Sequence, residues 1–357
     1  MTRLPLPLVP LLLLPLLTGA SPGPAEPGQD PQDEEAGPIV PEVDRVVQEA
    51  LERFGIAGAA AAVVQDGELV HRQFAGRTAW GDPIQAGTRF RLYSLTKLFT
   101  STAVFQLVDA GKLELERPVG EVLEGLPADW RGVTIAELLS HGSGLPDIVE
   151  LGDRPEEKAA EEVYGHALEA ERGVRYRYNQ TNYWLLLRVI ERVSGRPFQE
   201  FLVEGQLAGA HVPPVFCASL RKRVEGEAGA RFPFEPRYDQ VHDYLDACNG
   251  LLLDLDSVLA WSRRLDEGTL LAEESKARMW SPFPFREPAS FAHGWEIHRD
   301  GERRSLGFSG SMVTALREFP QDGLTVVFLG NGLQEFFDVE AVIEAMARPF
   351  LEGAEAR

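Results

Sequence analysis

The chain has 357 residues, 44% of them hydrophobic and 25% charged, and these ordinary globular proportions exclude a wholly disordered protein. Its 35 Lys+Arg against 55 Asp+Glu give a formal net charge of −20, which argues against a nucleic-acid-binding protein because phosphate backbones would repel it. With two cysteines, the chain fits neither a disulfide scaffold nor a Cys-rich zinc module.

The first 38 residues divide into an apolar leader and a polar tether. In residues 1–20, Arg3 precedes a run of leucines and prolines, and small residues follow, which is typical of a secretory signal peptide cleaved near Ala20. A membrane anchor is the alternative, but the run falls short of the ~20 apolar residues of a spanning helix, and prolines interrupt it. Residues 21–38 are rich in proline, glycine and acids, and are expected to be disordered.

We therefore expect an exported protein, periplasmic or extracellular, with no membrane span in its mature form. In such a compartment Cys217 and Cys248 either form a disulfide or remain separate as small buried hydrophobic residues.

Residues 39–357 are expected to form one α+β domain. Strand patterns occur near both ends of the chain, over 59–64, 69–74, 295–297, 304–308, 313–319 and 324–329. Helices are predicted over 41–54, 95–110 and 336–350, and residues of about 112–290 are mostly helix and loop. This order predicts an antiparallel sheet built from both chain ends, with flanking helices and a helical insertion beside it.

The strongest chemical signal is the segment Ser94-Leu-Thr-Lys97, at the start of the second predicted helix. Residues at i and i+3 share a helix face, so the serine hydroxyl and the lysine amine are expected to meet. The first helical turn favours negative charge, which suits an attacking serine oxygen, and a partly desolvated lysine amine can accept the serine proton. The pattern alone is weak, because Ser219-Leu-Arg-Lys222 repeats it by chance and Ser94 could be an ordinary helix N-cap.

Three further segments, in a fixed order, give this signal its specificity. They are Thr134-Ile-Ala-Glu-Leu-Leu-Ser-His-Gly-Ser-Gly-Leu-Pro-Asp147, Tyr176-Arg-Tyr-Asn-Gln-Thr-Asn-Tyr183 and Gly307-Phe-Ser-Gly-Ser311. Together with Ser-x-x-Lys they resemble the serine β-lactamase and penicillin-binding-protein superfamily, in its class C-like branch, over about residues 41–350. The resemblance implies an antiparallel sheet with flanking helices and a helical subdomain, with the site in the cleft between them.

The resemblance also implies roles for individual residues. Ser94 matches the nucleophile, Lys97 the lysine that activates it, and Tyr178 the tyrosine that passes the proton to the leaving group. The backbone N–H groups of Ser94 and Ser311 would form the oxyanion hole. The pocket for a small-molecule or peptide substrate would include Gln180, Phe308, Ser309 and Gly310. No cofactor or metal is expected, since the seven histidines show no metal-binding spacing.

Two positions depart from the family pattern. Gln180 stands where the family's Tyr-x-Asn motif has Asn, and its amide reaches one methylene further. Phe308 stands where the family has Lys or His, and a phenyl ring cannot bind a substrate carboxylate. We therefore expect an esterase or a peptidase-like enzyme acting on a neutral ester or amide. A β-lactamase or D-Ala carboxypeptidase, and a non-catalytic relative that binds a ligand or partner, remain as alternatives.

Other residues carry weaker signals. A Ser-His-Asp triad through His141 and Asp147 is conceivable, but that loop is structural in the family. Asn179-Gln-Thr181 is a glycosylation sequon beside the tyrosine, which we interpret as coincidence. Four aromatic residues before the C-terminal strands either pack in the core or line the acyl pocket: Trp280, Phe283, Phe285 and Phe291. The oligomeric state is not predicted.

Overall fold

The computed structural model describes residues 40–354 apart from 152–154, 217–225, 232–235, 238–241, 312 and 333–336. The predicted leader and tether, Cys217 and the second Ser-x-x-Lys copy lie outside the described residues. Among the described helices, none has the length and apolar character that crossing a bilayer requires.

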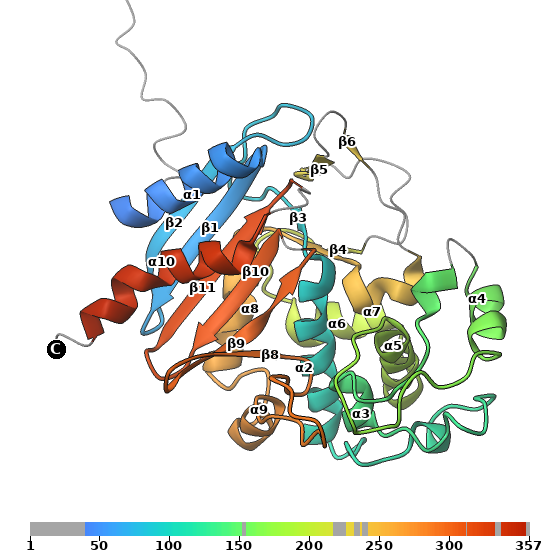
Figure 1. Cartoon of the computed structure of the whole chain (residues 1–357). Coiled ribbons are helices and arrows are strands. Elements are labelled where there is room, and N and C mark those ends of the chain that lie inside the picture. The colour runs from blue at the N-terminus through green and yellow to red at the C-terminus, as the bar shows by residue number, and fades with distance from the viewer. Residues whose placement is uncertain are drawn as a thin grey trace, which may run out of the picture. The chain divides into compact units, whose positions relative to one another are not determined.

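A six-stranded antiparallel sheet joins the two ends of the described chain, in the order β2-β1-β11-β10-β9-β8 (Figure 1). Its strands are β1 (Gly58–Gln65), β2 (Glu68–Gly76), β8 (Glu296–Asp300), β9 (Arg303–Gly310), β10 (Thr314–Phe319) and β11 (Leu324–Gly330). Ala59 of β1 pairs with Gly330 of β11, so the N-terminal hairpin continues directly into the C-terminal strands. The predicted α+β class and the antiparallel sheet from both chain ends are confirmed.

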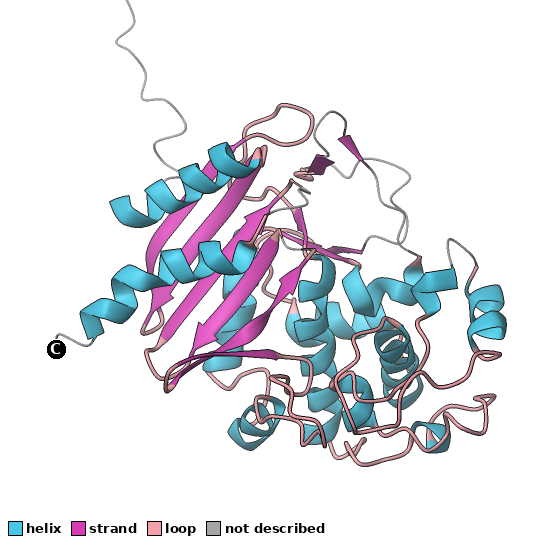
Figure 2. Ribbon diagram, in the orientation of Figure 1, coloured by secondary structure: helices cyan, strands magenta, loops and turns pink. Residues whose placement is uncertain are grey.

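Helices cover both faces of this sheet (Figure 2). On one face lie α1 (Pro41–Phe54) and α10 (Val339–Ala354), whose apolar residues share a buried cluster with Val326 and Phe328 of β11. On the other face lie α2 (Thr96–Asp109) and α8 (Leu255–Asp266). Alternation along β1 divides its small residues between the faces, since Ala59 and Ala61 pack toward α1 while Ala60 and Ala62 pack toward the second cluster.

A helical region surrounds α2 on the side away from the sheet. Its helices are α3 (Ile135–Leu139), α4 (Glu156–Val163), α5 (Thr181–Ser194), α6 (Phe198–Gln206) and α7 (Asp246–Asn249), and α9 (Glu273–Met279) also contacts α2. Because α2 is enclosed on all sides, every residue from Thr96 to Phe105 is buried. This enclosure buries the start of α2, including Lys97, while Ser94 just before the helix is half-buried.

The chain between the two parts of the large sheet also holds short strands, and those within residues 112–290 were not predicted from the sequence. A three-stranded sheet has the order β3 (Phe90–Arg91), β7 (Leu251–Leu253) and β4 (Val215–Phe216), and β5 (Ala230–Arg231) pairs with β6 (Pro236–Arg237). Strands of two or three residues are too short to show alternation, which is why the sequence predicted helix and loop there. The pairing of Phe90 with Leu253 matters for function, because it positions the chain just before Ser94.

Candidate active site

Ser94 lies in a tight turn between a strand and a helix. β3 ends at Arg91, a 3₁₀ turn spans Tyr93–Leu95, and α2 begins at Thr96. Tyr93 has a left-handed backbone with φ of 48°, which turns the chain sharply before the serine. The N-cap of α2 is Leu95, without a side-chain cap, so the interpretation of Ser94 as an ordinary N-cap is wrong. Its hydroxyl is directed to other catalytic candidates instead.

Lys97 is a fully buried cation whose described partners are all neutral. Its Nζ donates to the carbonyl oxygen of Cys248 at 2.7 Å, to Oε1 of Gln180 at 2.9 Å and to Oγ of Ser94 at 3.4 Å. No described carboxylate lies within ion-pair distance of it. The amine therefore keeps its charge free to act on Ser94 and its neighbours. The carbonyl of Cys248 has no side-chain signature, and sequence reasoning missed it.

Tyr178 and Gln180 complete the hydrogen-bonded group. The Tyr178 hydroxyl lies 2.6 Å from Oγ of Ser94, and Nε2 of Gln180 donates to the same hydroxyl at 3.2 Å. The Lys97 Nζ lies 4.9 Å from the centre of the Tyr178 ring. The structure thus brings together the predicted nucleophile, lysine and tyrosine. It also shows that both ends of the Gln180 amide are occupied within this group, one by Lys97 and one by Tyr178.

The hydrogens available in this group show which of its residues can donate and which can accept a proton. An ammonium on Lys97 has three hydrogens and meets three acceptors, so it is a donor throughout. The Tyr178 oxygen receives the amide hydrogen of Gln180 and can receive the hydroxyl hydrogen of Ser94 as well. With Lys97 charged, a Tyr178 phenolate is the group that is placed to accept the serine proton, while the ammonium stabilises negative charge on either oxygen.

The end of β9 packs against the turn that carries Ser94. A Cβ atom at Gly310 would lie 2.2 Å from the carbonyl oxygen of Leu92, so only glycine allows this approach. Oγ1 of Thr314 also donates to that carbonyl at 3.0 Å. Beyond this junction, Ser311 is exposed and has a left-handed backbone with φ of 45°. The two segments predicted to supply the oxyanion hole are thus neighbours in space.

Phe308 is buried beside the hydrogen-bonded group of Ser94, Lys97, Tyr178 and Gln180. It is 2% exposed, and its ring centre lies 6.0 Å from Nζ of Lys97 and 6.4 Å from the ring of Tyr178. Strand alternation places Gly310 on the same face as Phe308, while the half-buried Ser309 points to the opposite face. The four predicted pocket residues therefore differ in their relation to Ser94, and only Gln180 bonds directly to the catalytic group.

The four aromatic residues before the C-terminal strands have three different surroundings. Phe291 packs 6.0 Å from Phe308, which extends the apolar floor of the site. Trp280 instead packs against Trp295, with the ring centres 5.5 Å apart. Phe283 and Phe285 pack against each other and against the loop at Gly142.

His141 is fully buried and belongs to no Ser-His-Asp triad within the described residues. Its Nδ1 accepts from the backbone of Asn179 and faces the amide of Asn182, while the carboxylate of Asp147 accepts the backbone N–H groups of Val149 and Gln180. Burial, reinforced by the charge of Lys97, holds the pKa of His141 well below its usual range.

Two other residues with possible chemistry are buried and inactive in this structure. Asn179 of the sequon is 1% exposed and bonds through its side chain to Leu145 and Asn182, so it offers no access for a glycan. Cys248 is a free thiol, fully buried, and burial raises its pKa to about 12.

One described group of side chains has the spacing of metal ligands: His211, Asp254 and Asp256. Asp254 caps α8 through Ser257 and bonds to His211, and Asp256 pairs with Arg72. These contacts account for the group without an ion.

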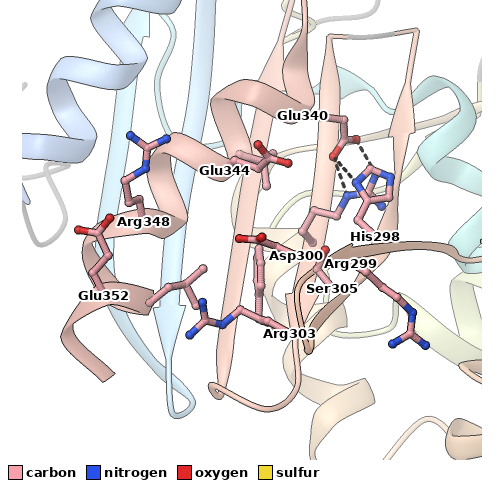
Figure 3. A pocket seen from close by; sticks show the side chains of 13 residues that line it. His298, Arg299, Asp300, Arg303, Ser305, Glu340, Glu344, Arg348 and Glu352 are labelled. Atoms are coloured by element: carbon pink, nitrogen blue, oxygen red, sulfur yellow. Dashed lines mark hydrogen bonds and ion pairs between the residues drawn. The ribbon is translucent and has the colours of Figure 1, made fainter. Parts of the chain in front are cut away.

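A charged hollow of about 630 Å³ lies between α10 and β8 to β10 (Figure 3). At its edge Glu340 contacts His298, and the same carboxylate binds the buried Arg317. Arg317 also binds Glu296 at 2.5 Å, which makes this network a link between the sheet and α10. Ala315 and Phe319 lie on the same face of β10 as Arg317, and both belong to the buried cluster beneath α10. The network therefore lies on the face of the sheet away from Lys97.

Comparisons with known proteins agree with this geometry. A model of the family described as Beta-lactamase matches residues 43–348. The chain is similar to penicillin-binding protein 4 of Amycolatopsis lactamdurans, with 29% identity over 314 residues that cover 78% of this chain and 81% of the relative.

Solved structures show the same fold at low identity. D-amino acid amidase from Ochrobactrum anthropi matches with a TM-score of 0.74 and 18% identity, over 88% of this chain and 99% of the amidase. EstCE1, a hydrolase with promiscuous acyltransferase activity, matches with a TM-score of 0.73 and 19% identity, over 87% of this chain and 97% of EstCE1.

Proposed function

Because this chain belongs to the β-lactamase family of serine hydrolases, we propose that it is an active hydrolase that forms an acyl-enzyme on Ser94. The observation that carries the proposal is the 2.6 Å contact between Oγ of Ser94 and the hydroxyl of Tyr178, beside the buried Lys97. A binding protein derived from this fold would have no reason to keep a buried lysine on neutral partners, because burying a charge without a counter-ion costs stability.

In the proposed acylation step Tyr178 acts as a phenolate: Oγ of Ser94 bonds to the carbonyl carbon of the substrate, and its proton passes to the phenolate oxygen of Tyr178. The carbonyl oxygen becomes an oxyanion, held by the backbone N–H groups of Ser94 and Ser311. When the tetrahedral intermediate collapses, the bond to the leaving group breaks and that group takes the proton from Tyr178. Gln180 orients the Tyr178 oxygen, and the nearby charge of Lys97 stabilises its phenolate form before the proton arrives and after it leaves.

Deacylation reverses the proton path with water as the nucleophile. Water gives a proton to Tyr178 and bonds to the acyl carbon, and the second tetrahedral intermediate releases the acid. Oγ of Ser94 leaves and takes the proton back, which restores the resting group. No cofactor takes part in the proposed cycle.

The proposed substrate class is a neutral ester or amide, with an ester favoured. Phe308 supports this choice because its ring occupies the position beside Lys97 and Tyr178 where the family has a basic side chain. Phe291 and Phe308 form an apolar floor, and Gln180 uses its amide on catalytic residues rather than on substrate. Apolar contact is therefore the main recognition that these side chains provide.

Steady-state kinetics with p-nitrophenyl acetate and with nitrocefin test the proposed class. We expect ester turnover that Ser94→Ala abolishes, with nitrocefin hydrolysed at least ~100-fold more slowly, because a charge-assisted contact to its carboxylate is missing. Equal turnover of the two substrates would contradict the ester preference. Absence of turnover of any kind in the wild-type protein would favour the non-catalytic alternative.

We also propose export, on the basis of the leader-like residues 1–20. N-terminal sequencing of the protein secreted by a bacterial host should find a mature chain that starts after Ala20. A product that keeps Met1 and stays in the cytoplasm would contradict export.

A further inference from the structure

The catalytic tyrosine of the proposed site lies in a segment without regular structure. Residues 176–179 belong to no helix or strand, and the Tyr178 side chain is 37% exposed. A proton transfer requires its oxygen to stay within hydrogen-bond distance of Ser94, and an irregular segment does not ensure this by itself. Some other group must fix the backbone around Tyr178.

His141 contacts the backbone on both sides of Tyr178. Its carbonyl oxygen accepts the N–H of Arg177 at 2.9 Å, and its Nδ1 accepts the N–H of Asn179 at 3.3 Å. One residue therefore holds the backbone N–H groups of the two residues that flank the tyrosine. Because a backbone amide can only donate, Nδ1 is the unprotonated nitrogen, and the proton of the neutral imidazole lies on Nε2.

The imidazole ring also supports the phenol directly. The two ring centres lie 4.6 Å apart with the planes tilted by 41°. Tyr183, at 5.2 Å, and Phe291, at 5.6 Å, enclose the other sides of the imidazole. Protonation would add a second cation near Lys97 inside this enclosure, so the arrangement requires the neutral ring.

The position of His141 is itself fixed by its backbone. It follows α3, whose first turn is held by a capping box between Thr134 and Glu137. His141 has a left-handed backbone with φ of 57°, a conformation that histidine and asparagine adopt more readily than most residues. The turn that follows α3 thus presents the acceptor nitrogen and the aromatic ring of His141 to the irregular segment 176–179.

We propose that His141 is the positioning residue of the reaction: as a neutral hydrogen-bond acceptor, it holds Tyr178 so that the phenol oxygen points at Ser94. It does not carry the proton. This inference rests on the proposed function, since it assigns a role within the same proton transfer.

Two substitutions separate positioning from proton transfer. His141→Asn tolerates the left-handed backbone and keeps an acceptor oxygen near the place of Nδ1, whereas His141→Ala removes both the acceptor and the ring. With p-nitrophenyl acetate we expect His141→Ala to lower kcat at least ~100-fold with KM within about threefold, and His141→Asn to restore kcat to within about tenfold of wild type. The acidic limb of the pH profile should be the same in His141→Asn and wild type.

A double-mutant cycle tests whether the effect passes through Tyr178. In a Tyr178→Phe background, the His141 substitutions should lower the residual rate by less than about threefold, because there is no phenol oxygen left to position. His71 supplies a matched control, since it is also fully buried and accepts a backbone N–H, that of Val40, through Nδ1. His71→Ala should lower the melting temperature without lowering kcat.

Several outcomes would overturn the inference. They are full activity in His141→Ala, equal losses in His141→Asn and His141→Ala, or a full additional loss in the Tyr178→Phe background. If circular dichroism shows that His141→Ala is unfolded, His141→Gln replaces it, and kcat equal to that of His141→Asn would then contradict the proposal. Failure of the proposed function looks different, because wild type would then show neither ester turnover nor labelling of Ser94.

Discussion

Two buried cations of this protein, Lys97 and Arg317, have opposite surroundings. Lys97 at the start of α2 binds two oxygens and a hydroxyl that carry no charge. Arg317 on β10 binds the carboxylates of Glu296 and Glu340. Burial alone would lower the pKa of Arg317, but the two carboxylates outweigh it and the net direction is upward.

This difference distinguishes a cation whose charge is available for a reaction from a cation that stabilises the fold. An arginine neutralised by two acids links the sheet to α10 and has no charge left for another partner. A lysine without a counter-ion lowers stability, yet its charge acts on the hydroxyl groups beside it. In this fold the uncompensated charge, rather than the best-paired one, lies at the site where we propose catalysis.

Replacing each cation in turn with methionine tests this difference with the largest expected effects. Lys97→Met removes a charge that has no counter-ion, so we expect a loss of at least ~10³-fold in ester turnover while the free energy of unfolding stays within about 1.5 kcal/mol of wild type. Kinetics and urea denaturation on the same preparation measure both quantities. Strong destabilisation by Lys97→Met would mean that the lysine is structural.

Arg317→Met should give the reverse result. It leaves Glu296 and Glu340 without their cation in a mostly buried site, and we expect a loss of about 3–5 kcal/mol in the free energy of unfolding. Ester turnover of the folded fraction should remain. If instead turnover fell as far as in Lys97→Met with stability intact, the proposed division between the two cations would be wrong.

The buried carboxyl group of Glu318 shows how burial affects an acid with which no described cation forms an ion pair. Burial, with a contribution from Asp266, raises its pKa to about 8, and Ser262 and Thr325 hydrogen-bond to it. The folded state then holds this proton more tightly than the unfolded state, whose carboxyl titrates near pH 4.5. The contribution of Glu318 to stability is therefore present below about pH 4.5 and is lost progressively as the pH rises to 8.

Glu318→Gln tests that linkage. Between pH 5 and 8 the variant should lose stability with pH less steeply than wild type, by up to about 1.4 kcal/mol per pH unit. Urea denaturation at four pH values measures the slope. Parallel slopes for the two proteins would show that Glu318 is ionised in the folded state throughout.

Phe308→His tests how a second basic side chain at the site changes substrate preference, and its expected effect is the smallest of these substitutions. A basic side chain beside Lys97 and Tyr178 should raise kcat/KM for a carboxylate-bearing ester about tenfold relative to a neutral ester of the same acyl group. The ratio of the two kcat/KM values measures this effect. An unchanged ratio would place Phe308 outside the substrate pocket.

The sequence predicted the elements whose signals are local. The helix over 41–54, the hairpin that follows it and the C-terminal strands all show clear periodicity, and Ser94 and Lys97 are only three residues apart. Strand β7, which pairs with the chain just before Ser94, consists of three buried leucines and shows no alternation that would predict it.

The unpredicted parts of the site depend on contacts between distant segments. The carbonyl of Cys248 reaches Lys97 across 151 residues, and no side-chain type marks a carbonyl in advance. The sequence motif around His141 indicates a structural loop or, less strongly, a Ser-His-Asp triad, and it gives no sign that the imidazole nitrogen faces the backbone of Asn179. The burial of Phe308 could not be inferred from its motif either, since it depends on how β9 packs against α2 and Phe291.

The central claim, that Ser94 is an activated nucleophile, is tested most directly by intact-mass spectrometry after exposure to a fluorophosphonate probe, with Ser94→Ala treated in parallel. The account predicts a gain of one adduct in wild type, located by peptide mapping to Ser94, and no gain in the variant. An unlabelled wild-type protein, or equal labelling of Ser94→Ala, would contradict it.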